Sequence, residues 1–130
     1  RLQLETAPEH SAIETATGVM HPELELPGYR AYLERTLGFY APVEARLIDL
    51  GVWEELELDA APRQKLGLIA RDISRLGGDA RGVPVCDAPP DLASLAQGIG
   101  CAYVLEGSTL GGRVISRHVQ ARRPALRARR

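Results

Sequence analysis

The chain has few aromatic residues and few cysteines, and each shortage limits what it can be. Aromatics make up 5% of the 130 residues, so the core has to be built from Leu, Ile, Val and Ala. Cys86 and Cys101 are too few and too widely spaced for a disulfide framework or a CxxC site. We expect both to be reduced thiols, for which burial as a small hydrophobic residue is the commoner role.

The chain also lacks a long apolar run and a strong net charge. No stretch approaches the roughly 18 apolar residues of a membrane span, and the first residues lack the charged-then-apolar layout of a signal peptide. The formal net charge is -1, which gives no general reason to expect binding to nucleic acid or to an anionic membrane. These absences predict a soluble, cytoplasmic protein without nucleic-acid or membrane partners.

What is present is an ordinary globular composition with helical patterning. With 45% hydrophobic and 25% charged residues, a chain of this length forms one domain around one core. No alternating run is long enough to predict a strand. Thr6 and Glu9 have the spacing of a capping box, Pro42 predicts a bend, and Asp91 is the expected cap of the last helix. We therefore predict an all-α bundle with helices near residues 6–19, 27–50, 62–76 and 91–119.

The last predicted helix contains an unusual number of glycines. A glycine inside a helix costs about 1 kcal/mol relative to alanine, so a cluster of them needs an explanation. At about 100° per residue, four residues point in nearly the same direction: Gly100, Gly107, Gly111 and His118. A face without side chains allows close approach of another helix or of a flat ligand. A helix that simply ends near Gly111 is a third interpretation. The sequence GSTLGG is not a nucleotide-binding loop, because it lacks the lysine of the GxxxxGK[ST] motif.

A histidine and a glutamate near the start of the chain form the second informative feature. His10 and Glu14 are four residues apart, so they share one face of the first predicted helix. There a carboxylate can accept the Nδ1 proton of the imidazole and leave Nε2 free to bind a metal. By itself such a pair is more often a surface histidine beside a helix-stabilising glutamate.

Together, these two segments resemble the haem oxygenases, particularly the bacterial biliverdin-producing type. The opening LETAPEHSAIE, residues 4–14, is similar to the proximal helix of that family, and AYVLEGSTLGG, residues 102–112, is similar to its distal helix. The segment RQKLGLIARDISRLG, residues 63–77, also resembles the family before its connecting loop. The resemblance covers residues 2 to about 119 and implies a haem-oxygenase-like helical bundle.

The resemblance implies an enzyme in which haem is both cofactor and substrate. In the family, a reductase or ferredoxin-type donor supplies electrons, O2 binds on the distal side, and haem is cleaved to biliverdin, carbon monoxide and ferrous iron. A bacteriophytochrome is then a candidate acceptor of the biliverdin. By position, His10 becomes the axial ligand of the iron and Glu14 its hydrogen-bond partner. The distal wall and its catalytic groups become Gly107, Ser108, Gly111 and Gly112.

The chain departs from the family pattern at the distal water and at the ends of the ligand. Many family members carry an aspartate where this chain has Ser108, whose hydroxyl can hold a water but cannot serve as the same acid. Family members bind the haem propionates with basic residues and a tyrosine. Here the candidates are Tyr103, Arg113 and Arg117, although an exposed position is the commoner role for both arginines.

The C-terminal end is the only strongly biased segment. The last fourteen residues contain six arginines and no carboxylate. We predict a helical domain at 1–119 and an arginine-rich tail at 120–130, and we expect the last helices of the family to be missing. The tail is then either an altered terminus of the coding sequence or a source of arginines for the haem propionates.

Two other functions are compatible with the sequence. The chain could bind haem or another tetrapyrrole as a carrier or sensor, in which case haem absorbance would stay stable in the presence of a reductant. It could also be a helical interaction module without a ligand, whose glycine face packs against a partner helix. No haem would then be retained after expression with a haem precursor.

Overall fold

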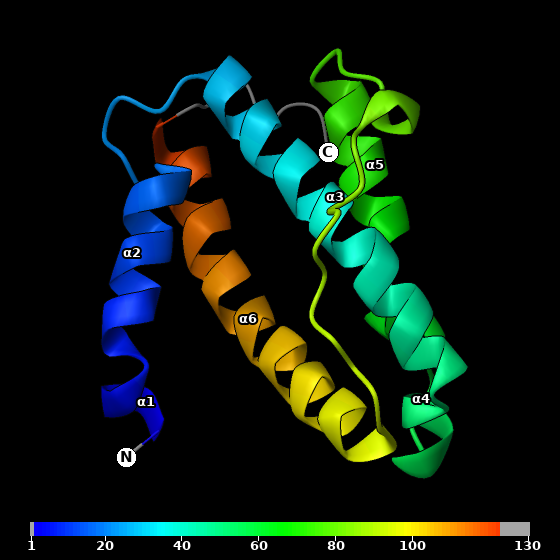
Figure 1. Cartoon of the computed structure of the whole chain (residues 1–130). Helices are drawn as coiled ribbons and strands as arrows, with labels where there is room; N and C mark the ends of the chain where they lie inside the picture. Colours follow the sequence, from blue (N-terminus) through cyan, green and yellow to red (C-terminus); the bar gives the residue numbers. More distant parts are fainter. Residues whose placement is uncertain (1, 123–130) are drawn as a thin grey trace.

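The polypeptide is all-helical, as its patterning predicts. The computed structural model describes residues 2–122, and no strand occurs among them. In Figure 1 the long helices α3 and α6 run through the molecule, with α1 and α2 on one side of α6 and α5 beside α3. The α-helices are α1 (Leu2–Glu5), α2 (Ala7–Thr17), α3 (Leu26–Asp49), α4 (Val52–Glu55), α5 (Leu66–Arg75) and α6 (Leu95–Arg122). Two short 3-10 turns lie in the connections, η1 (Ala61–Arg63) and η2 (Ala80–Gly82).

α3 is the helix on which most of the chain packs. Its 24 residues bury a stripe of aliphatic side chains at helical spacing, Leu33, Leu37, Val43 and Leu47. Pro42 lies inside α3, where it removes one backbone hydrogen-bond donor. After the helix ends, Gly51 adopts a φ of 69°, a left-handed conformation that glycine takes without strain. This residue turns the chain from α3 into α4.

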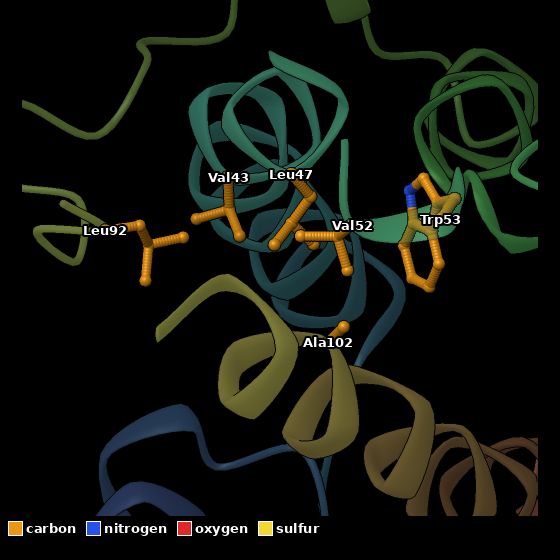
Figure 2. Close-up of a cluster of buried hydrophobic side chains, with 6 residues drawn as sticks. All are labelled: Val43, Leu47, Val52, Trp53, Leu92 and Ala102. Carbon is orange, nitrogen blue, oxygen red and sulfur yellow. The ribbon is translucent and has the colours of Figure 1, made fainter. Parts of the chain in front are cut away.

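Two clusters of buried side chains hold α3 to its neighbours. The first joins α3, α4, α6 and the segment before α6, and consists of Val43, Leu47, Val52, Trp53, Leu92 and Ala102 (Figure 2). The second joins α3 to α5 and consists of Leu33, Leu37 and Ile73. Leu66, Ile69 and Leu76 pack against the second cluster, which confirms the predicted apolar face of the third helix.

The third helix is shorter than predicted, and the connection before it is more ordered. Pro62 lies in η1 and not at the start of α5, which begins only at Leu66. The sequence prediction lacks α4, whose four residues bury Val52 and Trp53. Four residues are too few to show a helical period, so only the packing reveals this helix.

The predicted cap of the last helix is wrong, and that of the first helix is confirmed only in its position. α6 begins at Leu95 and not near Asp91, because Ser94 and Gln97 form a capping box at this end. The Gln97 Oε1 accepts the backbone N–H of Ser94 at 3.1 Å, and the Ser94 Oγ accepts that of Gln97 at 3.3 Å. Thr6 is the N-cap residue of α2, but its side chain does not form the capping hydrogen bond.

At its C-terminal end, α6 continues to Arg122, beyond the predicted end of the helical domain at residue 119. The rest of the predicted arginine-rich tail, residues 123–130, lies outside the described residues. No helix in the described part of the chain is long and apolar enough to cross a membrane.

Candidate functional site

α6 has two faces of opposite character, and the first is packed against the core. Ala102 is 2% exposed and points into the first cluster, as Figure 2 shows. Gly98 precedes Ala102 by about one helical turn, so both lie on this side of α6. A Cβ at Gly98 would come within 2.7 Å of the Val52 side chain. Only glycine fits here without a shift of the surrounding side chains or helices, and we call this side the packed face.

The opposite side of α6 carries the three glycines that share one line, Gly100, Gly107 and Gly111. They point about 140° to 180° away from Ala102 around the helix axis. A Cβ at any of the three, or at Gly112, would meet no atom of the described residues within 4 Å other than its chain neighbours and the nearby backbone of α6 itself. We call this side the open face. Close helix packing within the chain is therefore the wrong explanation for these glycines in the described part. A helix end near Gly111 is wrong too, since α6 runs through it.

Exposed apolar side chains border the open face. Tyr103, Val104 and Val114 are 75%, 65% and 55% exposed. Each lies within about 60° of the glycine line, Val104 on one side and the other two on the opposite side. A strip of bare backbone between exposed apolar side chains favours a flat apolar ligand, because both parts lose contact with water when it binds.

α2, which carries the predicted iron ligand, is also unpacked. None of its 11 residues is buried. The closely packed helix pairs are those of α3 with α4, α5 and α6 and of α4 with α6, whereas α2 packs closely only against α1. Figures 1 and 2 both show the N-terminal segment on the side of α6 that faces away from α3. A helix of this length is marginal in water by itself, so a partner that covers α2 would stabilise it.

His10 and Glu14 are both exposed on α2, and no hydrogen bond joins their side chains among the described residues. Both side chains are therefore accessible to a ligand. No group of three or more His, Cys, Asp or Glu residues that could hold a metal ion occurs in the described part of the chain. A metal bound at His10 would have to bring most of its ligands with it.

The polar partner of Ser108 is a residue that sequence reasoning missed. The Tyr40 hydroxyl on α3 lies 3.2 Å from the Ser108 Oγ on α6. The Ser108 hydroxyl donates to the Leu105 carbonyl at 2.6 Å, so the Tyr40 hydroxyl is the donor of the longer bond. The sequence places Tyr40 among the apolar positions of α3, and nothing in its spacing indicates a partner 68 residues away.

The other predicted residues are spread around α6. Arg113 and Arg117 are exposed and lie about 140° and 100° from the glycine line, so neither is on the open face. Their role at the ends of a ligand stays a prediction. His118 lies on the line itself and is partly buried, and its Nε2 is buried without a hydrogen-bond partner among the described residues. An unpartnered buried nitrogen is costly, so we expect a water or a polar ligand group beside it.

The two cysteines are free and partly buried. Cys101 packs against the first cluster, and burial raises the pKa of its thiol. A raised pKa lowers the fraction of the nucleophilic thiolate. Cys101 therefore acts as a small hydrophobic residue, as expected from the sequence.

Part of the chain is similar to a heme oxygenase. The relative is "Heme oxygenase" of Xanthomonas campestris pv. campestris (strain 8004), with 48% identity over 59 residues. The match covers 43% of this chain, and the chain spans 36% of the relative. No model of a known protein family matches the chain, and no solved structure matches it.

The described residues fit a haem. Haem is a flat, largely apolar macrocycle that supplies most ligands of its own iron, so one protein imidazole can complete the site. The open face offers bare backbone at Gly107 and Gly111 with an apolar border, and α2 offers the exposed imidazole of His10. A ligand of this shape would cover the two surfaces that the fold leaves unpacked.

Proposed function

We propose that the chain binds haem between α2 and the open face of α6 and acts on it as a haem oxygenase, an oxidoreductase. The open face carries this proposal, because Gly107 and Gly111 present bare backbone that no other described residue covers. Its border of exposed apolar side chains, such as Tyr103, suits a macrocycle better than a polar ligand. The partial similarity to a named heme oxygenase supports the same function independently of the geometry.

In this proposal His10 holds the iron through Nε2, and Glu14 accepts the Nδ1 proton and so fixes the tautomer of the imidazole. When bound, the haem supplies the O2-binding iron and is itself the substrate, cleaved to biliverdin, carbon monoxide and ferrous iron with electrons from a reductase or ferredoxin-type donor. Gly107 and Gly111 leave room for O2, because a side chain at either position would fill the distal space. Gly112, which the sequence predicts with them, points about 120° away from the glycine line. A bacteriophytochrome is the proposed acceptor of biliverdin.

Ser108 and Tyr40 are the polar groups that we assign to the distal side. Because Tyr40 donates to Ser108 and Ser108 donates to Leu105, both hydroxyl oxygens keep a lone pair that can accept a hydrogen bond from water. The pair would hold a water from which protons are delivered, in place of a carboxylate. Tyr103, Arg113 and Arg117 remain the proposed partners of the propionates.

Titration with hemin tests the binding step. The parent protein should develop a shifted Soret band and lose fluorescence from Trp53, its single tryptophan. His10→Ala should weaken binding by about a hundredfold, as expected for loss of a metal-binding side chain and its oriented partner. His21→Ala is the matched control, since His21 is an exposed histidine whose Nδ1 accepts the Glu23 backbone N–H at 3.2 Å. An unshifted Soret band in the parent, or an unchanged one in His10→Ala, would contradict the proposal.

Turnover with ascorbate or a reductase tests the catalytic step. Formation of biliverdin, identified by its absorption and mass, is the expected result. Stable haem absorbance under the same conditions would instead indicate a carrier or sensor. A protein purified without haem after expression with a haem precursor would favour the interaction module, with the open face of α6 as its binding surface.

A further inference from the structure

An ion pair ties α6 to the rest of the fold beside the open face. The Arg63 Nη1 in η1 lies 2.9 Å from the Glu106 Oε2 in α6. The two side chains are 27% and 36% exposed, so water screens this pair less than one at the open surface. The Arg63 guanidinium also lies over the Trp53 ring, 5.9 Å from its centroid, and Trp53 is buried in α4. The pair therefore connects α6 to a buried part of the core.

The position of this pair along α6 is informative. The α6 residues that pack on the first cluster run from Leu95 to Leu105, and two of the three open-face glycines, Gly107 and Gly111, follow them. Glu106 is thus held just after the last α6 residue that packs on the first cluster. Tyr40 ties down Ser108 from α3 in the same turn.

The two ties act from opposite sides of α6. Successive residues of a helix are about 100° apart, so Glu106 and Ser108 project to either side of Gly107. Arg63 holds one side and Tyr40 the other, and the glycine between them faces neither. This arrangement resists both a sideways shift of α6 and a rotation about its axis at Gly107.

We propose that Arg63 is a positioning residue, which through Glu106 sets how closely the backbone at Gly107 approaches the haem. This inference rests on the proposed function. Arg63 does not touch the ligand. It acts on α6, because contact between a flat ligand and bare backbone depends steeply on separation.

The chemistry of the pair supports a fixed geometry. The Arg63 Nε is buried with no hydrogen-bond partner among the described residues, so Glu106 is the acceptor on which the guanidinium depends. The other ion pairs of the described part do not reach α6. The pairs Arg30–Glu34 and Asp72–Arg75 each lie within one helix, and Asp79 and Arg81 lie in one turn with side chains 60% and 91% exposed.

Hydrogen exchange of the haem-free protein tests the positioning directly. Arg63→Gln and Glu106→Gln should each raise the amide exchange rate of residues 106–112, because α6 loses a contact just beyond its packing on the first cluster. Arg81→Gln removes an exposed ion pair of the same kind and should leave that rate unchanged. The exchanged-charge double variant, Arg63→Glu with Glu106→Arg, should restore most of the protection. Equal exchange in Arg63→Gln, Glu106→Gln and Arg81→Gln would overturn the proposal.

Hemin titration of the same variants tests the consequence for the ligand. Arg63→Gln and Glu106→Gln should weaken hemin binding by about fivefold and change the high-spin to low-spin ratio of the ferric spectrum. Arg81→Gln should match the parent, and the double variant should regain most of the affinity. Parent-like affinity and spectrum in Arg63→Gln would overturn the positioning role although haem binding stands. A parent protein that binds no hemin would instead overturn the proposed function, while the exchange rates would still decide whether Arg63 holds α6.

Discussion

The packed and open faces of α6 use the same residue type for opposite purposes. Each glycine inside the helix costs about 1 kcal/mol relative to alanine. At Gly98 this cost is offset by close packing, because a Cβ would come within 2.7 Å of Val52. At Gly107 no contact with a described residue offsets it, since a Cβ there would meet nothing within 4 Å. A residue that destabilises its helix without improving its packing is expected at a binding surface, because function there can require a less stable arrangement.

The largest expected effect compares the two faces by the same substitution. Gly98→Leu should lower the free energy of unfolding by about 3 kcal/mol, because the buried side chain of Val52 leaves no room for it. Gly107→Leu should raise that energy by up to about 1 kcal/mol in the haem-free protein, because leucine favours the helix. Urea unfolding of both variants measures the difference. Similar losses of stability would show that the open face is packed after all.

Hemin binding should be weakened by the substitution on the open face. Gly107→Leu should weaken binding by about a hundredfold, because the side chain fills the space next to the macrocycle. Gly67→Leu is the matched control. Gly67 is an exposed glycine of α5 whose Cβ would also meet nothing within 4 Å, so leucine fits there too, away from the open face. If the two variants bound hemin equally well, the open face would not be the ligand surface.

A substitution at Glu44, between α3 and the start of α5, should lower stability without changing hemin affinity. Glu44 is 7% exposed, and its Oε1 accepts the backbone N–H of Lys65 at 2.6 Å, just before α5. Glu44→Ala should lower the free energy of unfolding by about 2 kcal/mol, since the Lys65 N–H loses a charged acceptor. Hemin affinity, measured below the unfolding transition, should not change. A matching loss of hemin affinity would mean that the core and the open face are coupled.

Loss of the capping box should have a smaller effect on α6. Ser94→Ala should lower the free energy of unfolding by about 1 kcal/mol, because it removes the hydroxyl that caps Gln97 at the start of the helix. Ser74→Ala is the control, since the Ser74 hydroxyl bonds to the Ala70 carbonyl within α5 and replacement by alanine favours the helix. Thermal unfolding distinguishes them, and an equal shift in both variants would argue against the cap.

The smallest effect on stability is expected at the distal hydroxyl pair. Tyr40→Phe should change the free energy of unfolding by about 0.5 kcal/mol, because its bond to Ser108 is exposed to water. Turnover of bound haem should slow more than this small change implies if the pair holds a distal water. A parent-like rate of biliverdin formation would remove Tyr40 from the proposed mechanism.

The sequence could predict the long helices but not the short ones or their ends. α3 and α5 show clear periods because each buries one stripe, which includes Leu37 in α3 and Ile73 in α5. α4 is too short for a period. The start of α6 at Leu95 depends on hydrogen bonds of Ser94 and Gln97, which competed with Asp91 as an equally suitable cap by residue type.

In the candidate site, too, the sequence could predict only the features that depend on local spacing. The common direction of Gly100, Gly107 and Gly111 follows from helical spacing alone. Whether that line is packed or open depends on where the other helices lie, and the sequence left both interpretations standing. Tyr40 beside Ser108 and Arg63 beside Glu106 join residues 68 and 43 positions apart, which no local pattern can reveal.

By itself, the sequence determined that the chain is helical, that its core is aliphatic and that three glycines of the last helix share one line. These properties depend on the spacing of neighbouring residues, which the order of the chain sets. Only the tertiary structure decided that Gly98 is the packed glycine and Gly107 the open one, and that Arg63 and Tyr40 hold α6 on either side of it. Those properties depend on contacts between distant segments, which exist only once the helices have packed.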